Sequence, residues 1–107
     1  FLAYMSEQER EALLLRNALV EFTRHTITSK QALFDELHRI REQGYAIENG
    51  EYKIGLRSVA APVFDSDGRV RYAIGIIGMF RQIETQQFSH AVEVVCQTAS
   101  RITSSLV

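Results

Sequence analysis

Two apolar runs of alternating pattern lie in the middle of the chain. The segment from Gly55 to Phe80 reads GLRSVAAPVFDSDGRVRYAIGIIGMF, and the polar stretch Asp65-Ser66-Asp67-Gly68 divides it in two. Aspartate beside glycine is typical of a tight turn, because glycine adopts a positive φ at no steric cost. The pattern predicts a β-hairpin with these cross-strand pairs: Phe64 opposite Arg69, Ser58 opposite Gly75, and Leu56 opposite Ile77.

The two faces of this hairpin differ in bulk. One face carries large side chains of the kind that pack against helices: Val59, Val63, Val70, Tyr72, Ile74 and Ile76. The other face is shallow, with mostly small residues: Leu56, Ser58, Ala60, Ala73, Gly75 and Ile77. Because protein interiors are closely packed, either another part of the protein or a ligand must fill this face, and alternation leaves both open. One extra bulge residue at the turn would exchange the two faces.

Capping signals predict two helices before the hairpin. Ser6-Glu7-Gln8-Glu9 fits a capping box that opens a short helix through about Leu15. Thr28-Ser29-Lys30-Gln31 fits a second box, which opens an amphipathic helix that ends at Gly44.

A short strand and a long helix complete the pattern. Tyr45 to Glu48 reads as a strand, and the turn signal Asn49-Gly50 begins a loop that runs to Gly55. An apolar stripe at helical spacing predicts a terminal helix that opens near Thr85: Phe88, Ala91, Val92, Val95, Ala99, Ile102 and Leu106. The order helix, helix, strand, hairpin, helix is typical of an α+β layer arrangement.

Composition narrows the class of protein. The chain has 107 residues and 46% hydrophobic content, enough for the core of one domain. Its 12 basic and 13 acidic residues are spread along the sequence, without the basic stripe that nucleic-acid binding requires. The apolar runs are too short to span a bilayer, and the opening FLAYMSEQER does not have the pattern of a signal peptide. We therefore expect a cytoplasmic protein with no membrane partner, and the start at Phe1 indicates part of a longer one.

Few residues are arranged for metal or redox chemistry. His25, His38 and His90 stand far apart, with no carboxylate or thiol at ligand spacing. Cys96 is the one cysteine and falls in the apolar helical stripe, where we expect a small buried residue. We predict no metal site and no cofactor.

Catalytic groups are equally sparse. Ser58 lacks the flanking glycines of a nucleophile elbow, and Asp65 and Asp67 have the composition that the turn itself needs. Glu48 would lie near the mouth of the shallow face, although the same position also suits a solvated loop residue. An enzyme that acts through Glu48 would have no oriented partner group, so we expect no enzymatic activity.

Three stretches in order carry a resemblance that spans nearly the whole chain. They are FLAYMSEQEREALL, then FTRHTITSKQALFDELHRIREQGYAIENGE with its Thr-x-x-Thr-Ile-Thr lead, and then GLRSVAAPVFDSDGRV with its turn. Together they resemble the C-terminal effector-binding domain of IclR-family bacterial transcriptional regulators.

The resemblance implies a fold and a function. It implies a GAF-like antiparallel sheet flanked by helices that binds a small metabolite, often a carboxylate or aromatic acid. In the family such a domain controls an N-terminal winged helix-turn-helix, which contacts DNA and is not in this chain. Residues 1–107 would then be the C-terminal portion of the sensor domain, in a regulator that forms a homo-oligomer such as a dimer or tetramer.

Carried over by position, the family's ligand contacts fall on five residues: Glu48, Leu56, Ser58, Gly75 and Ile77. By this resemblance the Ser58 hydroxyl would donate to a ligand oxygen, and Glu48 would accept from a ligand hydroxyl. Gly75 and Ile77 stand where better-known members commonly have serine, and Met79 stands where proline is usual. These departures favour a larger or less polar ligand, for which Gly75 gives room and Ile77 an apolar wall.

Two functions remain open from the sequence. The first is effector sensing that regulates DNA binding and transcription, with ligand occupancy coupled to the state of the oligomer. The alternative is an oligomerisation or interaction module with no ligand of its own, whose shallow face is filled by protein.

Overall fold

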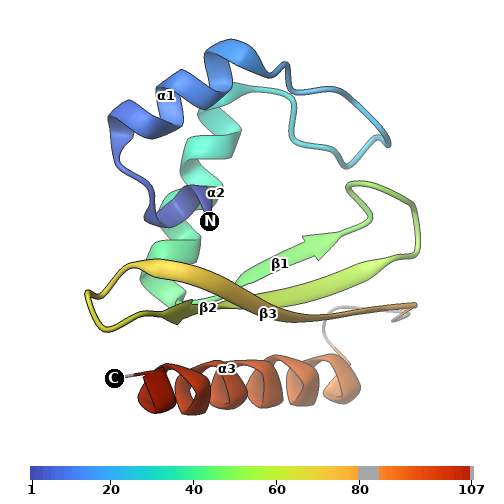
Figure 1. Cartoon of the computed structure of the whole chain (residues 1–107). Helices are drawn as coiled ribbons and strands as arrows, with labels where there is room; N and C mark the ends of the chain where they lie inside the picture. The colour runs from blue at the N-terminus through green and yellow to red at the C-terminus, as the bar shows by residue number, and fades with distance from the viewer. Residues whose placement is uncertain (80–84, 107) are drawn as a thin grey trace.

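Three antiparallel strands form a sheet with helices on both sides, one below it and two above it in Figure 1. The computed structural model describes residues 1–79 and 85–106, so Phe80, at the end of the predicted hairpin segment, lies outside the described residues. The elements in chain order are η1 (Leu2–Tyr4), α1 (Glu7–Arg16), α2 (Lys30–Gln43), β1 (Ala46–Asn49), β2 (Arg57–Phe64), β3 (Val70–Gly78) and α3 (Gln86–Leu106). The strand order is β1-β2-β3, and the predicted α+β class is confirmed.

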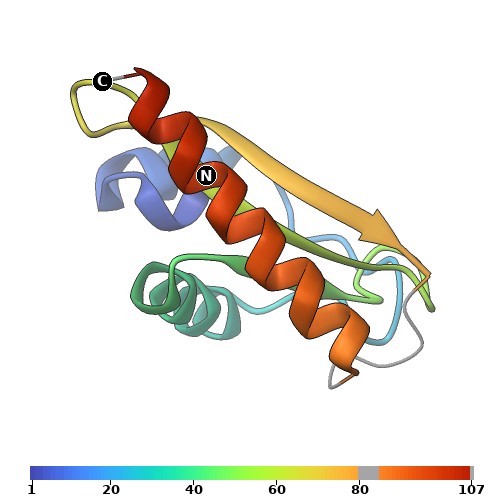
Figure 2. The same cartoon turned by 90° about the horizontal axis from the view of Figure 1, so that it is seen from below.

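The core lies between the sheet and α3. The buried residues of β2 are Val59, Ala61 and Val63, each at most 3% exposed. They pack against the apolar stripe of α3, whose buried members are Phe88, Ala91, Val95 and Ala99. Figure 2 shows α3 running obliquely along this face of the sheet. The large-residue face of the hairpin therefore packs against a helix, as the alternation predicts.

The predicted pairing of the hairpin is wrong by two positions. Ser58 lies opposite Ile77 rather than Gly75, and Gly75 lies opposite Ala60. Phe64 lies opposite Val70, and the pairing shifts at a bulge between Val63 and Phe64. The shift is even along most of the hairpin, so the residues keep their predicted faces; only Val70, beyond the bulge, pairs on the face of Phe64.

The helix starts follow the capping prediction with one correction. Ser6 caps α1, since its Oγ accepts from the Glu9 amide at 3.1 Å. The second cap is Ser29 and not Thr28, because the Ala32 amide donates to Ser29 Oγ at 3.1 Å. The helix α2 ends at Gly44, whose φ of +86° lies in the left-handed region that glycine favours.

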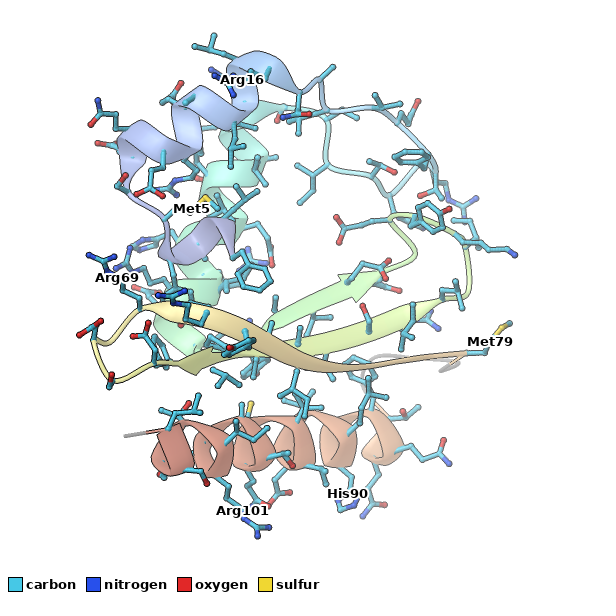
Figure 3. All side chains as sticks on the ribbon, in the orientation of Figure 1. Met5, Arg16, Arg69, Met79, His90 and Arg101 are labelled. Atoms are coloured by element: carbon cyan, nitrogen blue, oxygen red, sulfur yellow. The ribbon has the colours of Figure 1, made fainter. Side chains whose placement is uncertain are left out.

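The segment η1 joins α2 to the hairpin. The Tyr4 ring packs edge-on against Phe64 with centroids 5.5 Å apart, and the Arg41 guanidinium lies 5.5 Å from the Tyr4 ring centre. Met5 and Arg69 mark this end of the sheet in Figure 3, whereas Met79 marks the far end. The helical layer is thus anchored at the turn end of the hairpin, and the shallow face extends toward the other end.

Candidate functional site

Three of the predicted site residues form one row across the sheet. Glu48 on β1 lies opposite Ser58 on β2, and Ser58 lies opposite Ile77 on β3. The Ser58 hydroxyl donates to Glu48 Oε1 at 3.2 Å. The row therefore places a hydrogen-bonded carboxylate and hydroxyl beside an isoleucine.

The neighbouring row has almost no side-chain volume. It consists of Ala46, Ala60 and Gly75, which pair across the three strands. The two rows together give the face a polar strip of Glu48 and Ser58 next to a shallow strip. Because Ile77 is 65% exposed and Gly75 is also exposed, the β3 part of this face is open.

Strand packing explains why position 75 is a glycine, in addition to the predicted role of leaving room for a ligand. A Cβ built on Gly75 would lie 2.7 Å from the Val59 carbonyl oxygen and 3.3 Å from Ala60 Cβ. Real Cβ atoms essentially never approach an oxygen so closely, so the backbone of β2 would have to move. The hydrogen side chain at this position is required by strand pairing, whatever space it leaves for a ligand.

Leu56 lies outside the paired rows that hold the other four predicted site residues. It precedes β2 and is half-buried, and its carbonyl accepts from the Gly50 amide at 2.9 Å. The predicted pairing of Leu56 with Ile77 is therefore wrong. The leucine closes the loop between β1 and β2 at the edge of the shallow face.

A second hydrogen bond fixes the Glu48 carboxylate. The backbone amide of Glu51 donates to Glu48 Oε2 at 2.7 Å, within the short range of charge-assisted bonds. Burial raises the pKa of the Glu51 carboxyl above its ordinary value, and the negative charges of Glu48 and Glu36 raise it further. Two hydrogen-bond donors therefore stabilise the negative charge of Glu48, and this charge raises the pKa of the neighbouring Glu51.

Two threonines that the sequence interpretation did not select hold the loop beside Glu48. Thr23 Oγ1 donates to the Gly50 carbonyl at 2.5 Å, and Thr26 Oγ1 donates to the Glu51 carbonyl. No local pattern predicts these bonds, since they join residues 25 to 27 positions apart. The spacing of threonines in the sequence was their one visible signal.

The described part of the chain contains neither a metal-ligand cluster nor a membrane-spanning helix. No group of three or more metal-ligating side chains comes together among residues 1–79 and 85–106. Within the same residues, no helix has the length and apolar character needed to cross a bilayer. Cys96 is half-buried beside the core, and burial raises the pKa of its thiol.

Comparison with known proteins supplies the family. Residues 1–104 match the family described as bacterial transcriptional regulator IclR C-terminal. The HTH-type transcriptional repressor AllR of Escherichia coli K12 is 30% identical over 102 residues, which cover 95% of this chain and 38% of AllR. The chain thus spans little more than a third of the length of this relative.

Solved structures agree in fold. The C-terminal domain of the E. coli regulator KdgR superposes with a TM-score of 0.89 and 31% identity, covering 98% of this chain and 64% of that one. The inducer-binding domain of PobR from Acinetobacter, solved as a double mutant with 3-hydroxybenzoic acid, has a TM-score of 0.87 at 18% identity, covering 95% and 61%.

The relatives are transcriptional regulators, a class of proteins that are not enzymes. The matched family, the AllR relative and the KdgR domain all point to one group of proteins. The chain belongs to the IclR family of bacterial transcriptional regulators, whose C-terminal domain it matches over residues 1–104.

Proposed function

We propose that this chain senses a small-molecule effector on the shallow face of its sheet and so regulates DNA binding by an IclR-type regulator. The observation that carries the proposal is the row formed by Glu48, Ser58 and Ile77, which places two polar groups and an apolar wall beside an open strip of small residues. The DNA-contacting winged helix-turn-helix would lie outside residues 1–107.

The hydrogen bonding of the row supports one class of ligand. In the free protein the one hydroxyl proton of Ser58 is given to Glu48. A ligand hydroxyl that donates to Glu48 would replace Ser58 as donor and free the Ser58 proton for a ligand carbonyl or carboxylate oxygen. A molecule with a hydroxyl near an acceptor oxygen, such as a hydroxy acid, satisfies every partner in this exchange.

The rest of the face favours an apolar ligand body. Ile77 is 65% exposed, and full burial of such a side chain contributes about 1.5 to 3 kcal/mol. The Ala60 and Gly75 row offers no further hydroxyl. The ligand we propose is therefore an acid with a hydroxyl and an apolar or aromatic body, less polar than a small hydroxy acid.

Thermal shift and calorimetry on the full-length protein test this proposal. The panel contains 3-hydroxybenzoate, benzoate, and aliphatic hydroxy and keto acids. A ligand that binds the native state raises its stability by RT ln(1 + [L]/Kd), so saturation with a true effector raises Tm in a concentration-dependent way. We expect a hydroxylated aromatic acid to raise Tm more than its analogue without the hydroxyl.

Matched variants locate the site. Ser58→Ala removes the hydroxyl without adding bulk, and Ala60→Leu fills the shallow strip without the backbone clash that any side chain at Gly75 would cause. Ser89→Ala, on α3, is the control because Ser89 is exposed and remote from this face. Binding that survives both site variants would place the effector elsewhere and refute the assignment.

The exposed surface of β3 gives the alternative function its support. Tyr72 and Met79 are 61% and 77% exposed, and Ile76 is 39% exposed although it faces α3. Because β3 ends the described sheet, its outer edge has unpaired backbone groups that another strand would satisfy.

We propose that further strands of the same regulator cover this edge, and that the chain is the C-terminal part of a larger sensor domain in a homo-oligomer. The partial coverage of the KdgR domain supports this proposal. Native mass spectrometry of the full-length protein would distinguish effector sensing from an interaction module. An oligomer that retains no ligand from the cell and binds none of the added acids favours the interaction module.

A further inference from the structure

Two loops meet beside Glu48 and are joined by side-chain hydrogen bonds. Residues 17–29 lead into α2, and residues 50–56 connect β1 to β2; both lie at the right of Figure 1. The first loop contains the three threonines of the Thr-x-x-Thr-Ile-Thr stretch: Thr23, Thr26 and Thr28. Thr23 and Thr26 make the hydrogen bonds that join this loop to residues 50–56.

Thr23 holds one peptide unit that also reaches Glu48. The Gly50 carbonyl accepts from Thr23 Oγ1 at 2.5 Å, and the amide at the other end of the same peptide bond, on Glu51, donates to Glu48 Oε2 at 2.7 Å. A peptide unit is planar, so fixing its carbonyl fixes the direction of its N–H. A hydrogen bond to the carbonyl also polarises the amide and strengthens its donation.

Thr26 holds the next carbonyl and is itself oriented. Its Oγ1 donates to the Glu51 carbonyl and accepts from the amides of Phe22 and Thr23, at 3.1 and 3.0 Å. Thr23 Oγ1 likewise accepts from the His25 amide at 3.0 Å. Each hydroxyl therefore accepts from the backbone of its own loop and donates its proton to a carbonyl of the second loop.

We infer that Thr23, whose backbone amide is held by Thr26, is a positioning residue for the Glu48 carboxylate, through the chain Thr23, Gly50–Glu51 peptide, Glu48, Ser58. This inference rests on the proposed function, in which Glu48 accepts from a ligand hydroxyl. The two threonines do not line the ligand face. Thr23 sets the direction of the amide that holds Glu48, and so determines the preference for hydroxylated over non-hydroxylated ligands.

The test compares Thr23→Val, Thr23→Ser and Thr28→Val in the full-length protein. Valine keeps the β-branched shape without the hydroxyl, and serine restores the hydroxyl. Thr28 is the matched control, since it is exposed and its side chain makes no hydrogen bond within the described residues. Affinities for 3-hydroxybenzoate and benzoate are measured by calorimetry, and Tm without ligand is measured alongside.

We expect Thr23→Val to lose about three- to tenfold in affinity for 3-hydroxybenzoate, the equivalent of one net hydrogen bond, and less than about twofold for benzoate. Thr23→Ser should restore the ratio of the two affinities, and Thr28→Val should leave it unchanged. Equal losses for both probes, or a ratio in Thr23→Val like that in Thr28→Val, would overturn the inference.

A second measurement needs no ligand. Hydrogen exchange of the Glu51 amide should be about tenfold faster in Thr23→Val than in Thr28→Val, because the amide loses the restraint on its peptide unit. If neither probe binds the wild-type protein, hydroxybenzoates are excluded as effectors under the proposed function, and the exchange rate still decides the inference. Equal Glu51 exchange in the two variants would refute it.

Discussion

Replacing Glu48 with glutamine should lower stability slightly and shift the titration of its neighbour. The carboxylate of Glu48 accepts two hydrogen bonds, from the Glu51 amide at 2.7 Å and from Ser58 Oγ at 3.2 Å. Glutamine can keep both contacts, because its oxygen accepts from the amide and its nitrogen donates to the serine oxygen. The variant loses the charge and little else.

The expected change in stability follows from the charge. Hydrogen bonds to a charged group contribute about 1.5 to 3 kcal/mol and neutral ones about 0.5 to 1.5 kcal/mol. The loss is offset in part by relief of repulsion between Glu48 and Glu51. We expect Glu48→Gln to lower the free energy of unfolding at pH 7 by about 1 kcal/mol, measured by urea denaturation.

The pKa of Glu51 gives the sharper readout. Burial is the largest cause that raises it, followed by the charge of Glu48 and then that of Glu36. In Glu48→Gln the pKa of Glu51 should fall, yet stay above its ordinary value because burial and Glu36 remain. Carbon-13 titration of the side-chain carboxyl measures it, with Glu42→Gln as control, an exposed acid that pairs with His38. An unchanged Glu51 pKa would refute the electrostatic argument.

Three further predictions follow from the same structure. Glu51→Gln should stabilise the protein at pH 7, because an ionised carboxyl with a raised pKa disfavours the native state. The gain should disappear below about pH 4.5, where the carboxyl is protonated in both the native and the unfolded protein. Urea unfolding measured as a function of pH would show this dependence. Gly75→Ala should cost about 1 to 3 kcal/mol in the same assay, because its Cβ would lie 2.7 Å from the Val59 carbonyl oxygen, and an unchanged midpoint would contradict this close approach. Phe88→Ala should cost about 3 to 5 kcal/mol and abolish most of the thermal transition seen by circular dichroism, since Phe88 is 1% exposed in the core; a loss under 1 kcal/mol would mean that α3 is held elsewhere.

The sequence predicts the faces of the hairpin better than its pairing. The predicted turn has four residues, 65–68, whereas the observed loop has five, 65–69, between the paired Phe64 and Val70. The bulge between Val63 and Phe64 adds a second displaced residue. Each error alone would exchange the faces, and together they restore them. Alternation fixes which residues share a face, but turn length and bulges depend on contacts such as the Phe64 amide with Thr103 Oγ1 at 3.1 Å.

The arrangement of the candidate site residues was predictable only where strand pairing determines it. Glu48 and Ser58 face each other because β1 and β2 pair, and a resemblance was enough to select them. The predicted pairing of Leu56 with Ile77 is wrong because the two-position shift of the hairpin places Ser58 opposite Ile77. The bonds of Thr23 and Thr26 depend on how two loops meet in space, which no local sequence pattern encodes.

The shallow face has two physical explanations, and they separate at different residues. Gly75 is accounted for by strand packing, because the β2 backbone leaves no room for its Cβ. That account does not extend to Ile77, which is 65% exposed beside Ser58. A face closed by the described protein would bury this side chain, since an exposed isoleucine forgoes its burial free energy. Under the proposed function a ligand covers Ile77, and the Glu48 and Ser58 pair next to it favours an occupant with a hydroxyl over one that is purely apolar. Ala60→Leu distinguishes a bound ligand from a covering strand. Leucine at this position would block a ligand in the strip of small residues, but it would leave the outer edge of β3 free to pair with another strand.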